Sequence, residues 1–233
     1  MKKAYISASA GKHLTDYLSD AGYEVVSVDG SAMDPPSPVY NEILTHPDIH
    51  MCQTGLWENA RIFPGNTAEL ECRYPGNIIY NAVCTGKYFI HNLRYTAPDL
   101  MEHIRLRFPG IIIVDVRQGY TRCSCLPVDE RSFITSDRGI ASALSGYDVD
   151  VLLIEPGHIS LPGFDYGFIG GCGGGVIASG RKILVFNGDL SRHPDYKKIA
   201  TFAEDRDIDI VFFEDCPLED TGSILVSCDD ITV

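Results

Sequence analysis

Residues 46–53 concentrate side chains that can do chemistry. Their sequence is His-Pro-Asp-Ile-His-Met-Cys-Gln. In an extended strand successive side chains point to opposite faces, so apolar and reactive residues would separate here onto two faces. Imidazole, carboxylate and thiol groups serve as acids, bases, nucleophiles or metal ligands. We therefore expect a strand whose reactive face lines a functional site, the alternative being a polar face that only meets water. That face would carry His46, Asp48, His50 and Cys52.

Three further cysteines lie on strands that would face the same interior. A thiol nucleophile needs a base or a positive group nearby and a group that receives its proton. Cys172 lies in the glycine-rich run 170–175, which we interpret as a loop whose backbone N–H groups can approach a ligand. For each cysteine alone, burial as a small apolar side chain is the competing interpretation. The three candidates are Cys123, Cys172 and Cys228.

Metal binding is another chemistry open to these residue types. Alternate residues of a strand are about 7 Å apart, so neighbouring pairs of the 46–52 face could share one ion, whereas all four residues could not. A zinc site would need ligands from elsewhere, for instance Cys123 and Cys125. We expect neither a bound metal nor a cofactor.

Polar residues near predicted strand ends are candidate ligand contacts. For Asp189, in Asn-Gly-Asp, turn formation is the stronger interpretation. Phe168 could cover a pocket or pack in the core. The candidate substrate-binding residues are Asn81, Asn92, Cys123, Phe168 and Asp189.

Composition limits the classes of function. The 233 residues are 45% hydrophobic and carry a formal net charge of −13. An acidic surface repels phosphate backbones, so we expect a small cationic or polar ligand and no nucleic-acid partner. The sequence begins without an apolar signal segment and no stretch reaches the length of a membrane span, which predicts a cytoplasmic protein without a membrane partner. The eight cysteines are then expected to be thiols. The oligomeric state is not predicted.

The elements that would position these residues recur along the chain. A strand, a second strand, a helix and a third strand follow one another in units of about 40 residues, a period typical of repeat architectures. The complete units are predicted at 77–83, 87–92, 97–108 and 111–116; at 120–128, 132–135, 138–144 and 149–154; and at 164–170, 182–186, 194–206 and 208–213. A degenerate unit has only strands 46–53 and 60–63.

The two ends of the chain each hold part of a fifth unit. Residues 1–30 read as strand 3–9, helix 11–21 and strand 24–28, whereas residues 222–233 read as strand 222–228 and a last short strand at Ile231. Pairing the ends would complete the unit and remove a sheet edge. We therefore expect one α/β domain over residues 1–233, an α/β propeller of five strand-strand-helix-strand repeats closed across the termini. An ordinary open α/β sheet is the alternative.

Such a five-unit array resembles the pentein fold, the α/β propeller of enzymes that modify guanidino groups. Local motifs are similar to those of an uncharacterised bacterial family assigned to this fold. They are His46-Pro-Asp-Ile-His-Met, Gln118-Gly-Tyr-Thr-Arg-Cys-Ser, Ile134-Thr-Ser-Asp, Gly167-Phe-Ile-Gly-Gly and the run Asn187–Tyr196.

The resemblance implies a chemistry. In the enzymes of this fold a cysteine near the C-terminus attacks the guanidinium carbon, a histidine of a His-x-Asp segment moves protons, and carboxylates bind the cation. The segment Thr221–Cys228 matches the place of the terminal cysteine only loosely. His46-x-Asp48 matches the His-x-Asp motif but lies in an earlier unit than in the enzymes. The strand 120–128, which corresponds to the position of the enzymes' histidine, has no histidine.

Two functions stay open at this point. One is a C–N hydrolase or transferase for a small guanidino, amidino or amide compound, with Cys228 or Cys172 as nucleophile and His50 or His46 as base. The other is a non-catalytic pentein that binds a partner, and a metal-binding hydrolase is a third, weaker possibility. Catalysis requires an imidazole within hydrogen-bond reach of a thiol, or one water away.

Overall fold

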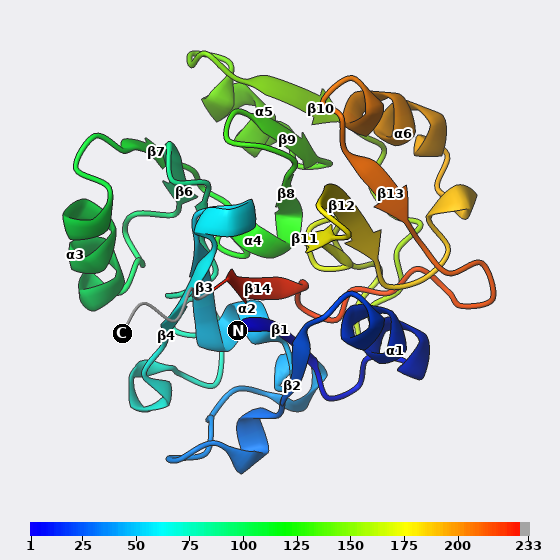
Figure 1. The fold of residues 1–233 in the computed structure, drawn as a ribbon. Coiled ribbons are helices and arrows are strands. Elements are labelled where there is room, and N and C mark those ends of the chain that lie inside the picture. Colours follow the sequence, from blue (N-terminus) through cyan, green and yellow to red (C-terminus); the bar gives the residue numbers. More distant parts are fainter. Residues whose placement is uncertain (229–233) are drawn as a thin grey trace.

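The computed structural model describes residues 1–228, which form a mixed α/β protein with four small mixed sheets. Figure 1 shows the sheets around a common centre, with helices α1, α3, α5 and α6 at the periphery. None of the helices in the described part of the chain combines the length and apolar character needed to cross a bilayer.

Three sheet units follow one connection rule. The inner strand runs antiparallel to the middle strand, a helix follows, and the outer strand runs parallel to the middle one. The units are β5 (Val83–Cys84), β6 (Tyr88–His91), α3 (Pro98–Arg107) and β7 (Ile112–Asp115); β8 (Cys125–Pro127), β9 (Ser132–Thr135), α5 (Arg138–Leu144) and β10 (Asp150–Leu153); and β11 (Gly173–Ala178), β12 (Arg181–Phe186), α6 (Tyr196–Glu204) and β13 (Asp209–Val211).

A fourth unit of the same kind joins the two ends of the chain. It consists of β1 (Lys2–Ser7), α1 (Lys12–Asp20) and β2 (Glu24–Val28), with β14 (Leu225–Cys228) as inner strand. Strand β14 pairs antiparallel with β1, with Lys3 opposite Ser227. The predicted pairing of the ends is therefore confirmed. The short strand expected at Ile231 lies outside the described residues.

The degenerate unit is incomplete in the structure as well. Strands β3 (Met51–Thr54) and β4 (Arg61–Pro64) pair antiparallel, and β3 joins β5 through Thr54 and Cys84. A five-stranded sheet β4-β3-β5-β6-β7 results. The remaining short elements are α2 (Pro47–His50), α4 (Thr121–Ser124) and the 3-10 turns η1 (Gly30–Ala32), η2 (Asn41–Ile43), η3 (Trp57–Asn59), η4 (Thr67–Glu69) and η5 (Leu190–Arg192).

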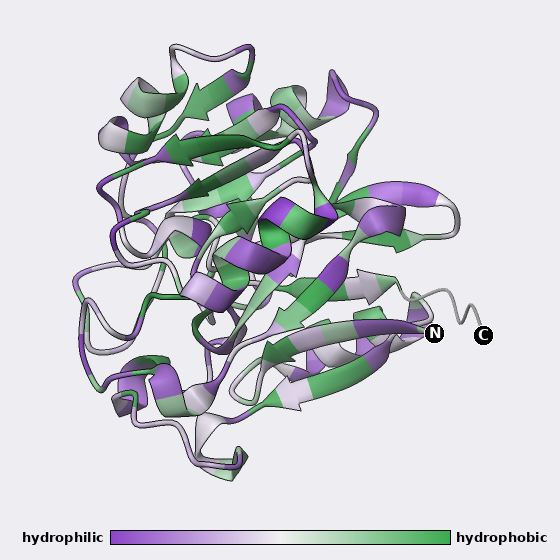
Figure 2. Ribbon diagram, turned by 90° about the vertical axis from the view of Figure 1, so that its left-hand side faces the viewer, coloured by the Kyte–Doolittle hydropathy of each residue, from purple (hydrophilic) through white to green (hydrophobic). Residues whose placement is uncertain are grey.

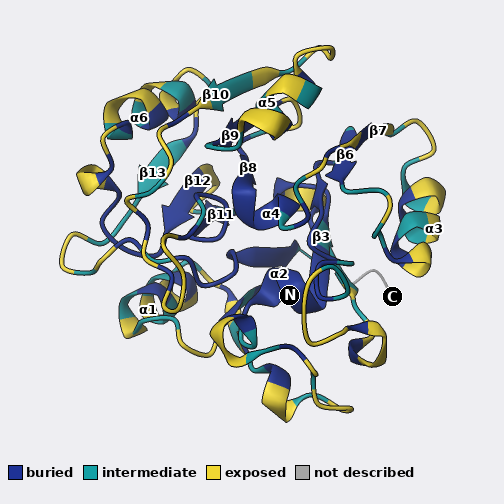
Figure 3. Ribbon diagram, turned by 180° about the vertical axis from the view of Figure 1, so that it is seen from behind, coloured by how far each residue is buried: buried dark blue, intermediate teal, exposed yellow. Residues whose placement is uncertain are grey.

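Each peripheral helix attaches to its sheet through one apolar stripe. Residues four apart lie on the same helix face. Figure 2 shows hydrophobic and hydrophilic residues mixed along the helices, and Figure 3 shows buried inner elements with helices exposed on their outer sides. The buried pairs are Leu14 and Leu18, Leu100 and Ile104, Ile140 and Leu144, and Ile199 and Ala203.

The predicted inner strands were wrong over part of their length at 46–53, 77–83 and 120–128, and over the whole of 164–170. In place of one strand over 46–53, residues 47–50 form the helical turn α2, and only 51–54 are extended. Pro47 favours this turn at its first position because its fixed φ suits a helix and its missing N–H costs nothing there. The reactive residues therefore do not share one strand face.

The same shift occurs in the later units. Residues 121–124 form α4 before β8, whereas 77–82 and 164–170 lie outside strands. The glycine run 170–175 is a loop only in its first half, because residues 170–172 form a turn and Gly173–Gly175 open strand β11. A Cβ on Gly174 would stand 2.0 Å from the Ile224 carbonyl oxygen, so glycine here permits close backbone packing.

These non-strand segments meet at the centre and are hydrogen-bonded in a ring. Asp48 N–H donates to the Gly222 carbonyl, Arg122 N–H to that of Asn81, Gly171 N–H to that of Cys123, and Ser223 N–H to that of Gly171. The Asn81 side-chain amide closes the ring by donating to the Asp48 carbonyl. Five segments, 46–50, 77–82, 120–124, 168–172 and 220–224, are thereby fixed against one another.

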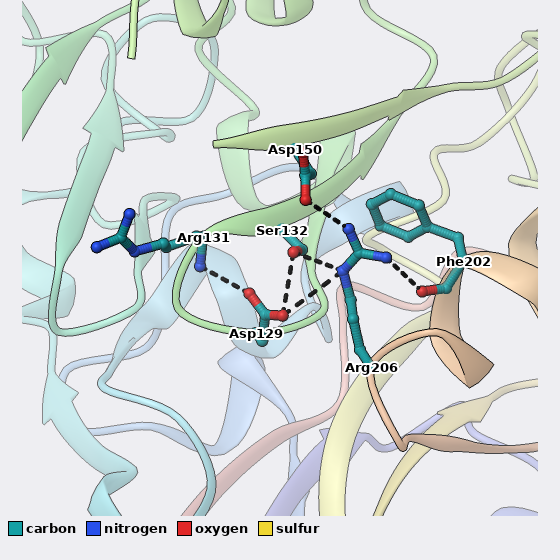
Figure 4. Close-up of polar contacts among 6 residues, drawn as sticks. All are labelled: Asp129, Arg131, Ser132, Asp150, Phe202 and Arg206. Atoms are coloured by element: carbon teal, nitrogen blue, oxygen red, sulfur yellow. Dashed lines mark hydrogen bonds and ion pairs between the residues drawn. The ribbon is translucent and has the colours of Figure 1, made fainter. Parts of the chain in front are cut away.

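On the outside, Arg206 connects α6 to the neighbouring sheet, as Figure 4 shows. Its guanidinium donates to Ser132 Oγ at 2.6 Å, to Asp150 Oδ2 at 2.8 Å and to the Phe202 carbonyl at 2.7 Å. The Arg206 side chain is only 15% exposed. Arg206 therefore links the unit that contains α6 to the sheet of β9 and β10 on the outside of the protein.

Candidate functional site

Three reactive side chains meet at the central ring. His46 precedes α2, Asp48 lies in its first turn, and Cys123 lies in α4. One ligand atom of each lies within 4.8 Å of the other two, and all three residues are buried. The structure thus brings an imidazole within one water molecule of a thiol, the spacing that catalysis requires.

Asp48 accepts hydrogen bonds from two other side chains at the centre. Its Oδ2 accepts hydrogen bonds from Cys123 Sγ at 3.0 Å and from Ser223 Oγ at 2.5 Å. Its Oδ1 is buried and has no hydrogen-bond partner among the described residues. An unpaired buried acceptor costs free energy, so this oxygen lacks a partner that buried polar groups normally have.

Asn81 fixes the position of Cys123. Its Oδ1 accepts from the backbone N–H groups of Arg122 at 2.8 Å and Cys123 at 3.3 Å. Its Nδ2 lies 3.3 Å from Cys123 Sγ and donates to the Asp48 carbonyl at 3.2 Å. The amide therefore fixes both the backbone and the sulfur of the candidate nucleophile.

Burial favours the neutral forms of Cys123 and His46. Burial, followed by the charge of Asp48, raises the pKa of the Cys123 thiol well above its ordinary value. Burial lowers the pKa of His46 to about 4, against the opposing effect of Asp48. The free protein near pH 7 therefore holds a neutral imidazole and a protonated thiol, and thiolate formation requires an added positive charge.

The nearest buried cation is not placed to supply that charge directly. Arg122 donates to the carbonyl oxygens of Gly170 at 2.9 Å and Gly173 at 3.1 Å. Burial lowers its pKa, and Asp48 is the largest opposing influence. Arg122 thus offsets the charge of Asp48 while two of its N–H groups donate to backbone carbonyls.

A second carboxyl group, Asp220, lies next to the cluster. Its oxygens accept from the N–H groups of Phe168 at 2.9 Å and Gly222 at 3.0 Å. Burial and then the charge of Asp48 raise its pKa to about 7. A Cβ on Gly171 would stand 1.9 Å from Asp220 Oδ1, so a glycine is required beside this carboxyl.

A cavity of about 160 Å³ opens onto these groups. His46, Cys123 and Asp220 supply its polar wall. Its other walls are aromatic and aliphatic, which suits a flat ligand with a polar end. They are Tyr40, Ile43, Tyr120, Leu161, Phe164, Tyr166 and Phe168.

Some of the residues singled out from the sequence converge here. His46 and Asp48 meet Cys123, which we had expected to contact substrate, and Asn81 and Phe168 lie beside them. Sequence reasoning missed Asp220 and Ser223. The polar run Asp-Thr-Gly-Ser directly before the last apolar strand was the available signal.

The other candidate residues have local structural contacts. The His50 ring bonds to the Leu44 carbonyl at 2.7 Å, and Cys172 Sγ donates to the Ile169 carbonyl at 3.2 Å. Cys228 ends strand β14, half-buried, where Lys2 lies opposite it. Asn92 donates to the Arg117 carbonyl, and Asp189 caps η5 through Ser191 N–H.

Cys52 also lies apart from the cluster. It is buried in β3, with its thiol 3.6 Å from the Ala82 carbonyl. Because α2 is helical, His50 and Cys52 do not join Asp48 in the cluster with His46 and Cys123. The contacts of His50 and Cys52 thus lie outside the cluster, and the buried Nδ1 of His50 has no hydrogen-bond partner among residues 1–228.

The fold and the site define a mixed α/β protein with a buried Cys-His-Asp cluster beside an aromatic cavity. The chain belongs to DUF6873, a family of unknown function, which matches residues 56–225. That range contains Asn81, Cys123 and Asp220 and ends at the start of β14, whereas His46 and Asp48 precede it. No protein with a curated description matches the chain.

Proposed function

We propose that the chain is a C–N hydrolase or transferase for a small cationic guanidino or amidino compound, built as a pentein-type propeller. The observation that carries the proposal is the meeting of His46, Asp48 and Cys123 at the aromatic cavity. Cys123 is the nucleophile in this proposal, in place of Cys172 or Cys228.

The propeller arrangement is supported by the common order of the sheet units, the β14–β1 pairing and the central ring of hydrogen bonds. Residues 1–30 and 222–233 would complete one unit of a single domain. The centre of such a ring gathers one segment from every unit. That gathering accounts for a site whose members are distant in sequence.

A cationic ligand suits the charges of the cavity. Asp220, in the cavity wall, is an acceptor for N–H groups of a guanidinium or amidinium, and the negative charge of Asp48 acts on Asp220. Its positive charge would favour the ionised carboxyl of Asp220 and the thiolate of Cys123. Binding and activation of the nucleophile are thereby coupled.

The reaction then divides into two steps. The Cys123 thiol passes its proton to Asp48 Oδ2, with which it is already hydrogen-bonded, and the sulfur bonds to the central carbon. The C–N bond breaks as Asp48 returns that proton to the leaving nitrogen. Water then attacks the carbon as neutral His46 takes a proton from it, and the C–S bond breaks as His46 returns that proton to the Cys123 sulfur.

An electrophilic amidine tests the assignment. Chloroacetamidine forms an S–C bond and releases chloride, and the thiol proton leaves to solvent. We expect peptide mass spectrometry to find the adduct on Cys123 in wild type and in the matched controls Cys172→Ser and Cys228→Ser. The variant Cys123→Ser should lose both the adduct and the turnover of a panel of guanidino, amidino and amide compounds. Labelling that favours exposed Cys72 over Cys123, with no turnover in the panel, would reject the proposal.

A further inference from the structure

The side chains of His46, Asp48 and Cys123 also form a ligand set for a metal ion. Their imidazole nitrogen, carboxylate oxygen and sulfur lie within 4.8 Å of one another. Ligands of one tetrahedral zinc ion stand about 3.5 Å apart, given bonds of about 2.0–2.3 Å. Small side-chain rotations would therefore close the set around an ion.

A second observation points to a cation independently of this spacing. Asp48 is 1% exposed, and its Oδ1 has no donor within residues 1–228. A metal ion would supply the missing partner. Its other oxygen already receives two donors, so the free oxygen is the one with an open position for an ion.

The residues around the three ligands are those that a metal site needs. Asn81 Nδ2 lies 3.3 Å from the sulfur, and Ser223 Oγ donates to Asp48 Oδ2 at 2.5 Å. Such contacts orient the ligands and tune their affinity. The cavity in front of His46 and Cys123 leaves a fourth position for water, as in open zinc sites.

We propose that His46, Asp48 and Cys123 bind one divalent cation of the zinc type. The mixed nitrogen, oxygen and sulfur donors favour zinc over magnesium or calcium, which prefer oxygen alone. The ion replaces the thiol proton that Cys123 now directs to Asp48. One thiolate and one carboxylate then balance its two positive charges.

Metal binding does not depend on the proposed hydrolase activity. A metal-bound sulfur is not free to attack carbon, so the site would hold either an ion or a reacting substrate. The two proposals are tested apart, because metal binding is measured without substrate and turnover is measured in the presence of a chelator.

The test uses the full chain, stripped with a chelator and titrated with Zn²⁺ against a chromophoric competitor, and with Co²⁺ alone. We expect one ion per chain and a thiolate-to-cobalt charge-transfer band in the near ultraviolet. Cys123→Ser should abolish the band and weaken zinc binding at least about 100-fold, and Ser223→Ala should weaken it about 10-fold. The matched control Cys52→Ser, another buried thiol, should leave both unchanged.

His46→Gln is the second variant, in case Cys123→Ser fails to fold. It should keep the sulfur-to-cobalt band, altered in energy, and weaken zinc binding at least about 100-fold. Wild-type protein that shows no charge-transfer band would overturn the proposal. So would zinc affinity that neither variant changes.

Discussion

The thiol of Cys123 donates a hydrogen bond to Asp48 Oδ2 across 3.0 Å, although the two residues lie 75 positions apart. The negative charge of Asp48 favours the protonated thiol. The same contact therefore suppresses the thiolate in the free protein, and in the proposed reaction it is the path by which the thiol proton leaves.

Replacing Asp48 with Asn should lower the pKa of the Cys123 thiol, because the neighbouring negative charge is removed. The rate of iodoacetamide alkylation at Cys123, followed by peptide mass spectrometry, should reach its midpoint at a lower pH than in wild type. Turnover should nevertheless fall by about 10²–10⁴-fold, because the proton acceptor is lost. Exposed Cys72 serves as the internal control and should alkylate as before. An unchanged or higher midpoint at Cys123 would contradict this account.

The pH dependence of stability should carry a contribution from Asp220. Its pKa rises from 3.8 in an unfolded reference to about 7 in the folded protein, chiefly through burial. Between these values the folded state binds more protons, so this contribution to stability is complete below pH 3.8 and is lost as pH rises through 7.

Asp220→Asn does not titrate and should therefore gain stability relative to wild type as pH rises across that window. The gain is at most about 1.4 kcal/mol per pH unit. Urea unfolding at several pH values from about 4.5 to about 7.5 measures it. The comparison between the two proteins cancels His46, whose lowered pKa acts in the opposite direction. A difference that stays constant across this range would show that Asp220 ionises normally.

Gly222 should tolerate no side chain. It has φ +79°, and a Cβ there would stand 2.2 Å from His46 Cβ. Gly22, at φ +85° with nothing within 4 Å of its Cβ position, is the matched control. Gly22→Ala should cost only the left-handed backbone penalty of about 1–2 kcal/mol. Gly222→Ala should cost a further 1–3 kcal/mol, roughly, and displace His46.

Both alanine variants are compared by urea unfolding and by turnover. Gly22→Ala should keep wild-type turnover because it lies far from the cluster, at the end of α1. Equal losses of stability in the two variants would mean that the chain at Gly222 moves away from His46 without cost.

Arg206 should contribute more to stability than an exposed ion pair. Arg206→Ala removes three charged hydrogen bonds from a side chain that is 15% exposed, and should cost about 1–3 kcal/mol in urea unfolding. The matched control Arg181→Ala removes a pair with Asp209 that is 61% and 44% exposed. It should cost less than about 1 kcal/mol. A larger loss of stability in Arg181→Ala than in Arg206→Ala would contradict this prediction.

The sequence by itself determined the repeated order of elements, since helical and strand periodicities are local properties. Leu14 and Leu18, or Ile140 and Leu144, mark helix faces by their spacing alone. The pairing of the two ends was also inferable, because residues 1–30 lacked an inner strand and residues 222–228 supplied one. Charge and composition favour a small cationic ligand, and this stays a prediction.

Only the tertiary structure decided how the reactive residues combine. An alternating pattern cannot distinguish a strand from a helical turn followed by a strand, and Pro47 favours the turn. His46, Asp48 and Cys123 meet because segments from different units bond to one another at the centre. Asp220 and Ser223 lie beside this cluster because the backbone packs closely around Gly171 and Gly222. No hydrophobic periodicity in the sequence indicates these contacts. Burial, which sets the proton affinities of Cys123 and Asp220, is likewise a property of the assembled centre.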